Sequence, residues 1–141
     1  MSVQKKPKAA KAAKKTAPIA ANIVWFEIPA DDLKRARSFY SKLFGWKMDR
    51  FPGPKEYWHI DTAGPDASPD GGLLPRQNPG HRGITNYIMV PSVNKAAAKV
   101  QKLGGVVCMP KTAVPHMGWF VICQDTEGNM FALWEKDETA A

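Results

Sequence analysis

Residues 23–46 read IVWFEIPADDLKRARSFYSKLFGW and predict a strand, a tight turn and an amphipathic helix. Within the strand, Trp25 and Glu27 fall on one face and the apolar residues between them fall on the other. Because both faces carry large side chains, we expect both to be largely covered. Asp31 or Asp32 can cap the helix, since a short acidic side chain accepts hydrogen bonds from the first free N–H groups.

The chain repeats this plan. Residues 85–105 read TNYIMVPSVNKAAAKVQKLGG, which again predicts a strand, a turn with proline and a helix that stops at a glycine pair. The first helix ends in the same way, at Gly45. Repetition of one module predicts a pseudo-symmetric arrangement with a cavity between the two copies.

Short apolar runs separated by turn residues complete each copy. Strands are expected at residues 56–62 and 71–75 in the first copy and at 106–109, 118–123 and 129–134 in the second, with a linker at 75–83, a loop at 111–116 and a hairpin turn at 125–128. Antiparallel strands that follow one helix per copy predict an α+β fold whose sheets curve around a shared cleft.

The positive charge is concentrated at the N-terminus. The chain carries a formal charge of +7, and six lysines with no acidic residue lie within the first eighteen positions, so the remainder has 14 basic and 13 acidic residues. Residues 1–20 therefore read as a solvated, disordered tail. Such a tail can simply aid solubility, or it can make a weak, salt-dependent contact with nucleic acid or another polyanion.

Other features narrow the class of protein. Cys108 and Cys123 lack metal-type spacing and lie in apolar runs, which favours buried thiols. No run of about 18 apolar residues occurs, and the N-terminus lacks the apolar segment of a secretory signal. We therefore expect a cytoplasmic protein with no membrane partner.

Taken together in order and spacing, several motifs resemble the vicinal oxygen chelate superfamily, which includes glyoxalase I, bleomycin-resistance proteins, methylmalonyl-CoA epimerase and extradiol dioxygenases. The motifs are WFEIPADD at 25–32, FGW at 44–46, GGL at 71–73, LGG at 103–105 and DTEGNMF at 125–131. The resemblance implies one domain over residues 21–138, followed by a C-terminal end at 139–141. Its two βαβββ modules, 22–75 and 84–136, would form a U-shaped cleft, and the protein would be a homodimer.

The resemblance also implies where metal ligands would lie. In metal-using members, His or Glu ligands come from the first and last strands of each module. Those positions fall here on Trp25, Thr85, Ala132 and either Leu73 or Leu74. An indole N–H only donates, a lone hydroxyl is a poor substitute for imidazole, and alanine and leucine carry no ligand atom. We therefore expect no metal and no other cofactor.

The candidate site residues divide into apolar walls and polar groups. Glu27 and His59 are the candidate catalytic groups, and Trp25, Tyr87, Met89, His116, Trp119 and Trp134 are the candidate ligand-binding residues. Glu27 on an apolar strand can have a raised pKa and act as a base, or it can serve as a structural hydrogen-bond acceptor. The face of His59 and the exposure of His116 stay open, as does a residual metal site built from Glu27, His59 and His116.

Two functions follow. The first is a metal-independent protein that binds a small, partly aromatic or apolar molecule, as bleomycin-resistance proteins do. The alternative is an enzyme of the same superfamily, a lyase, isomerase or dioxygenase-like member. Such an enzyme would use Glu27 as a base, or it would hold a divalent metal ion at a site other than the four positions named above.

Overall fold

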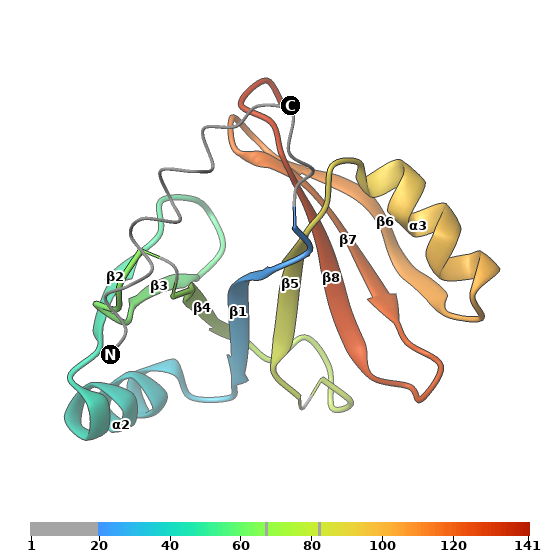
Figure 1. Ribbon diagram of the computed structural model, residues 1–141. Helices are drawn as coiled ribbons and strands as arrows, with labels where there is room; N and C mark the ends of the chain where they lie inside the picture. The colour runs from blue at the N-terminus through green and yellow to red at the C-terminus, as the bar shows by residue number, and fades with distance from the viewer. Residues whose placement is uncertain (1–19, 67, 82) are drawn as a thin grey trace. The chain divides into compact units, whose positions relative to one another are not determined.

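The computed structural model describes residues 20–66, 68–81 and 83–141, and the contacts divide them into two units (Figure 1). The first unit contains residues 25–84, and the second contains residues 20–24 and 85–141. The boundary between residues 84 and 85 lies at the start of the repeated segment 85–105. The Lys-rich tail at 1–19 lies outside the described residues.

The first unit has the predicted strand, helix and two later strands, and an additional strand at Lys47–Arg50 directly after the helix. Its elements are β1 (Ile23–Ala30), α2 (Leu33–Phe44), β2 (Lys47–Arg50), β3 (Trp58–Asp61) and β4 (Asp70–Pro75), of which β1 begins in the second unit. The strands lie in the order β2-β3-β4-β1, with β1 parallel to β4 and the other neighbours antiparallel. This is one βαβββ module.

The second unit has the same topology. Its elements are β5 (Thr85–Met89), α3 (Val93–Lys102), β6 (Val106–Val114), β7 (Gly118–Gln124) and β8 (Met130–Lys136). The strands lie in the order β5-β8-β7-β6, and β5 is parallel to β8. The predicted α+β fold of two βαβββ modules is confirmed.

Local chemistry sets the ends of α2. Asp32 is the N-cap, and its Oδ1 accepts a hydrogen bond of 2.9 Å from the Arg35 N–H. At the other end Gly45 has a φ of 74°, a left-handed conformation that glycine adopts without steric cost. The sequence predicted the stop at Gly45 and left the cap to Asp31 or Asp32, and the structure assigns the cap to Asp32.

Each helix covers one face of its own sheet. In the first unit, Ile28, Leu73 and Ile60 pack with Leu33 of α2, and Phe26, Tyr40 and Trp46 lie against this cluster. The predicted alternation along β1 is thus confirmed, because Phe26 and Ile28 point to α2 while Trp25 and Glu27 lie on the opposite face. We call that opposite face of the first sheet the polar face.

The structure corrects two predictions in β6. This strand runs to Val114 and pairs with β7 as far as Gly118, so residues 111–114 are strand and not loop. Register shifts between Val107 and Met109, and between Met109 and Thr112, let the strand continue past Pro110. The same irregularity leaves Cys108 exposed, whereas Cys123 is buried as expected.

Candidate functional site

Polar side chains converge on the polar face of the first unit. Trp25 and Glu27 come from β1, and their register partners on β4 are Asp70 and Gly72. On β3, His59 pairs with Gly72, so it shares the face with Glu27. Side chains from three strands thus lie on the same face of the sheet. The sequence left the face of His59 open, and the strand register places it on the polar face.

Tyr57 joins two of these side chains in a hydrogen-bonded chain. The Trp25 indole Nε1–H donates to Tyr57 Oη at 2.8 Å, and Tyr57 Oη donates to Glu27 Oε2 at 2.7 Å. Gly72 makes room for the phenol, because a Cβ at that position would overlap the Tyr57 hydroxyl and ring. Glu27 therefore has the structural acceptor role that the sequence left as one alternative.

The Tyr57 phenol stays protonated. Burial, together with the negative charge of Glu27 and the hydrogen bond to it, raises the pKa of Tyr57 far above its usual value near 10, against a smaller opposing effect of the bond from Trp25. Since the hydroxyl keeps its proton, it serves as a fixed donor to Glu27.

A second polar pair lies beside this chain. His59 Nε2 is 3.1 Å from Asp70 Oδ2, and the two side chains are 40% and 34% exposed. Asp70 Oδ1 accepts from the Thr62 backbone N–H at 3.1 Å and from the Thr62 hydroxyl at 3.2 Å. Partial burial opposes ionisation of Asp70, but the bonds from Thr62 and His59 together outweigh it and lower the pKa of Asp70.

An aromatic ring links the two polar groups. The ring centroids of Trp25 and His59 are 5.4 Å apart with a tilt of 37°. Trp25 is therefore bonded through its N–H to Tyr57 and packed by its ring against His59. The polar face combines an aromatic ring with an imidazole and two carboxylates.

The second unit presents an apolar group on the sheet face opposite α3. The ring centroids of Tyr87 and Phe120 are 6.2 Å apart, Met89 pairs in register with Trp134, and Trp134 lies over Gly118, where a Cβ would be 2.6 Å from the indole Cζ2. Tyr87, Met89 and Trp134 thus share one face of the second sheet.

Trp119 lies elsewhere, which corrects its predicted place beside Tyr87 and Trp134. It packs with the core under α3, its Nε1–H donates to Asp137 Oδ2 at 2.9 Å, and Lys111 Nζ lies 4.4 Å from its ring centroid. His116 is exposed in the turn between β6 and β7, with a φ of 65°. Neither residue belongs to the apolar group of Tyr87.

The residues at the family's metal positions do not fit a metal. The Trp25 N–H is a donor that is already bonded to Tyr57, Leu73 is fully buried in the core, and Ala132 has no ligand atom. Across the described residues, no group of three or more His, Cys, Asp or Glu side chains is arranged to hold a metal ion. We therefore derive no step through a metal.

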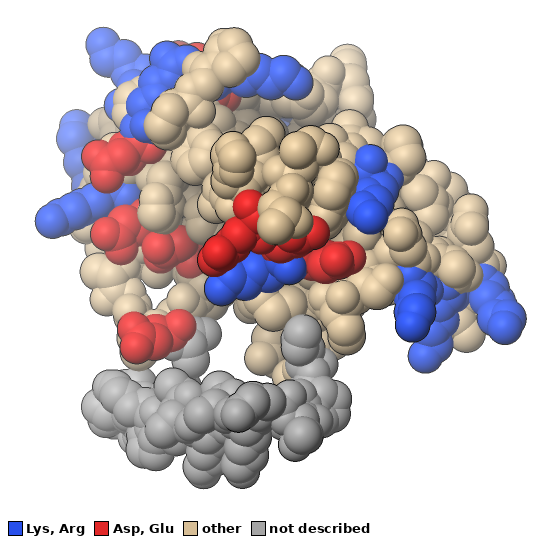
Figure 2. Space-filling view, turned by 90° about the horizontal axis from the view of Figure 1, so that it is seen from above, with Lys and Arg blue, Asp and Glu red and all other residues tan. Residues whose placement is uncertain are grey.

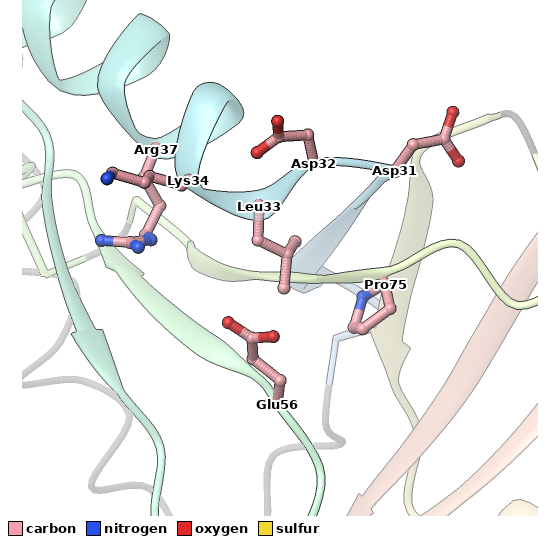
Figure 3. Close-up of a pocket in the computed structure, with 7 residues that line it drawn as sticks. All are labelled: Asp31, Asp32, Leu33, Lys34, Arg37, Glu56 and Pro75. Carbon is pink, nitrogen blue, oxygen red and sulfur yellow. The ribbon is translucent and has the colours of Figure 1, made fainter.

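A shallow hollow of about 400 Å³ lies at the start of α2, away from the polar face. Its lining is Asp31, Asp32, Leu33, Lys34, Arg37, Glu56 and Pro75 (Figure 3). Most of its charged groups already have structural partners: Asp31 pairs with Arg76, Asp32 caps α2, and Glu56 accepts from the Trp58 indole. The hollow is better explained by local structure than by a ligand.

The surface charge of the described residues is mixed. Figure 2 shows Lys and Arg side chains lying among Asp and Glu side chains on the face seen from above. This agrees with the near balance of 14 basic and 13 acidic residues outside the first eighteen positions.

Neither helix among the described residues has the length and apolar composition that a membrane-spanning helix needs.

Comparison with known proteins now decides the family. Residues 22–62 match the family model for the N-terminal part of bleomycin-resistance-like proteins. A glyoxylase-like domain-containing protein of Didymella fabae is 34% identical over 112 residues, which cover 76% of this chain and 88% of that protein. The chain belongs to the glyoxalase/bleomycin-resistance family, within the vicinal oxygen chelate superfamily.

One further relative agrees with the assignment, and one solved structure shares the fold. CFP32 of Mycobacterium tuberculosis is 30% identical over 115 residues, which cover 79% of this chain but only 44% of CFP32. The crystal structure of a glyoxalase/bleomycin resistance protein/dioxygenase superfamily member from Vibrio splendidus superposes with a TM-score of 0.62 at 14% identity, covering 84% of this chain and all of the other. At that identity the likeness concerns the fold.

Sequence reasoning missed Tyr57 and Asp70 in this glyoxalase-like protein. Tyr57 is two residues before His59, so a period of two would place both on one face. Asp70 directly precedes the glycine pair and reads as a turn residue. The pairing of β4 with both β1 and β3, which no local pattern reveals, brings them to the site.

Proposed function

We propose that this protein binds a small, flat, partly apolar molecule without a metal. The observation that supports this proposal is the set of side chains on the polar face. There the Trp25 ring lies beside His59, and its N–H is linked through the Tyr57 hydroxyl to Glu27. A rigid aromatic surface flanked by a few fixed polar groups is the usual composition of a small-molecule site. His59 and Asp70 are exposed enough to be reached by a ligand.

The apolar group of the second unit supports the same proposal. Met89 and Trp134 are half-buried and offer thioether and aromatic surface of the kind that packs on planar ligands, whereas Tyr87 is buried and packs with Phe120 on the same face. His116, exposed on its turn, is proposed as a further contact. We leave out Trp119, because its indole is held in the core under α3.

Tryptophan fluorescence tests this function. A panel of planar aromatic and antibiotic-like compounds, titrated with and without a chelator, is expected to give saturable quenching that the chelator does not change. The Trp25→Phe variant is expected to lose most of this quenching. Trp58→Phe is the matched control, because Trp58 lies on the α2 side of the same sheet, with Arg37 3.8 Å from its ring centroid.

The outcomes separate clearly. Saturable quenching that Trp25→Phe weakens and Trp58→Phe preserves supports binding on the polar face. Equal loss in both variants, or no saturable quenching across the panel, would count against it. Quenching that requires an added divalent ion would overturn the metal-independent part of the proposal.

Acid–base catalysis is a second candidate, favoured by the contact between His59 and Asp70. A carboxylate that holds an imidazole by one nitrogen leaves the other nitrogen able to accept a proton, the arrangement of many general bases. Such an enzyme would be a lyase or isomerase, with Glu27 as a further base. Once a substrate is found, Glu27→Gln and His59→Gln each test the role of the side chain that they replace, and unchanged turnover removes that residue from the mechanism.

A homodimer is proposed as the working assembly, following the family resemblance. Light scattering coupled to size-exclusion chromatography tests it directly. A monomer mass across the concentrations used for binding would remove the dimer from the proposal.

A further inference from the structure

Asp70 is held so that each of its carboxylate oxygens has its own donor. Oδ1 accepts the Thr62 backbone N–H and hydroxyl, and Oδ2 faces His59 Nε2 at 3.1 Å. The same bonds lower the pKa of Asp70 despite its partial burial, so the side chain is an anion that can only accept hydrogen bonds. The nitrogen that faces it must carry the proton.

This arrangement fixes the tautomer of His59. In a neutral imidazole one nitrogen donates and the other accepts, and the bond made by one nitrogen decides the role of the other. Since Nε2–H donates to Asp70, Nδ1 is the acceptor. His59 is 40% exposed and its ring lies beside Trp25, so a ligand on the polar face can reach it.

The donors of the neighbouring aromatic side chains are already used. The Trp25 N–H is bonded to Tyr57, and the Tyr57 hydroxyl proton is bonded to Glu27. Asp49, the register partner of His59 on β2, adds another carboxylate beside the imidazole. A flat molecule stacked near Trp25 therefore meets acceptors rather than donors.

We propose that His59 Nδ1 is a specificity-determining hydrogen-bond acceptor, that Asp70 is the positioning residue that holds it in this tautomer, and that the polar face therefore selects flat ligands carrying an N–H or O–H donor. This inference rests on the proposed binding function and names the ligand class. It assigns Asp70 a role that its turn-like sequence context does not suggest.

Replacing Asp70 with asparagine gives a sharp test. The Thr62 backbone N–H requires an acceptor at the Oδ1 position, so the amide oxygen of the introduced side chain would lie there and its NH₂ group would face His59. An NH₂ group donates, so His59 Nε2 would become the acceptor and Nδ1 would carry the proton. Asp70→Asn would thus turn His59 Nδ1 from a hydrogen-bond acceptor into a donor, while the shape of the side chain at position 70 hardly changes.

The first readout needs no ligand. At about pH 8, above the ordinary range of imidazole titration, long-range ¹H–¹⁵N spectra of labelled protein distinguish a protonated ring nitrogen from an unprotonated one. We expect Nδ1 of His59 to be unprotonated in the natural chain and protonated in Asp70→Asn. His81 is the internal control, because its Nδ1 accepts the Gln77 N–H at 3.2 Å far from the substitution.

The second readout compares two flat, bicyclic aromatic probes of similar size. Indole has an N–H donor and no acceptor nitrogen, whereas quinoline has an acceptor nitrogen and no donor. The natural chain is expected to bind indole about tenfold more tightly, the scale of one well-placed hydrogen bond. Asp70→Asn is expected to reverse this preference, and His59→Gln, whose amide can offer either group, to abolish it.

Each outcome bears on the proposal. A protonated Nδ1 in the natural chain overturns the tautomer assignment even if both probes bind, which leaves the binding function standing. An unprotonated Nδ1 with equal affinity for both probes overturns the selectivity. Failure of both probes to bind refutes the selectivity and counts against the binding function as well. If Asp70→Asn does not fold, the tautomer of the natural chain and the His59→Gln titrations still decide the matter.

Discussion

Gly72→Ala probes the contact that builds the polar face. The Tyr57 phenol lies directly over Gly72, so a Cβ at this position would overlap its hydroxyl and lie 2.5 Å from Cε1. The ring would have to move, and both the bond from Trp25 and the bond to Glu27 would be lost. The substitution therefore tests the geometry of the site through stability.

The expected loss follows from three contributions. Forcing an extra methyl group into a packed contact costs about 1–3 kcal/mol. The two lost hydrogen bonds cost about 1 kcal/mol each. Reduced freedom of the unfolded chain returns about 0.4–1 kcal/mol when glycine becomes alanine. We expect a net loss of about 2–5 kcal/mol in the free energy of unfolding.

Urea unfolding followed by tryptophan fluorescence measures this loss. Gly83→Ala is the matched control, because a Cβ there meets no atom within 4 Å, and it should change the free energy by less than about 0.5 kcal/mol. In a Tyr57→Ala background Gly72→Ala should cost far less, since the obstacle has gone. A loss below about 0.5 kcal/mol in the natural background would refute the placement of Tyr57 over Gly72.

Three further predictions concern a thiol pair, a helix cap and acid stability. Burial, with a smaller contribution from Cys108, raises the pKa of the Cys123 thiol to about 11. Ellman's reagent should therefore react with exposed Cys108 in the native protein and with Cys123 only after unfolding. Rapid reaction of both thiols in the native protein would contradict this. Asp32→Ala removes the N-cap of α2 and should lower the free energy of unfolding by about 1 kcal/mol in the urea assay, with no loss expected if the cap is unimportant. The lowered pKa of Asp70 stabilises the fold above the unfolded value of about 3.9, and this contribution is lost as the pH falls through the folded value. The urea midpoint of the natural chain should therefore fall more steeply below about pH 4 than that of Asp70→Asn, and parallel curves would remove Asp70 from the acid response.

The sequence alone determined the modules and their faces. Alternation along residues 23–28 separated Trp25 and Glu27 from the core, and the Asp31–Asp32 pair and Gly45 marked the ends of α2. The repeat and the order of motifs identified the family. These signals are local, since a strand period, a cap and a left-handed glycine each involve only a few neighbouring residues.

The tertiary structure alone decided which side chains meet. Tyr57 and Asp70 reach Trp25, Glu27 and His59 because β4 pairs with β1 on one side and β3 on the other. Trp119 was misplaced for the same kind of reason, since the register of β7 turns it toward α3. Strand register joins residues distant in the chain, and a shift of one position moves every side chain to the other face, so no local pattern could have fixed the site.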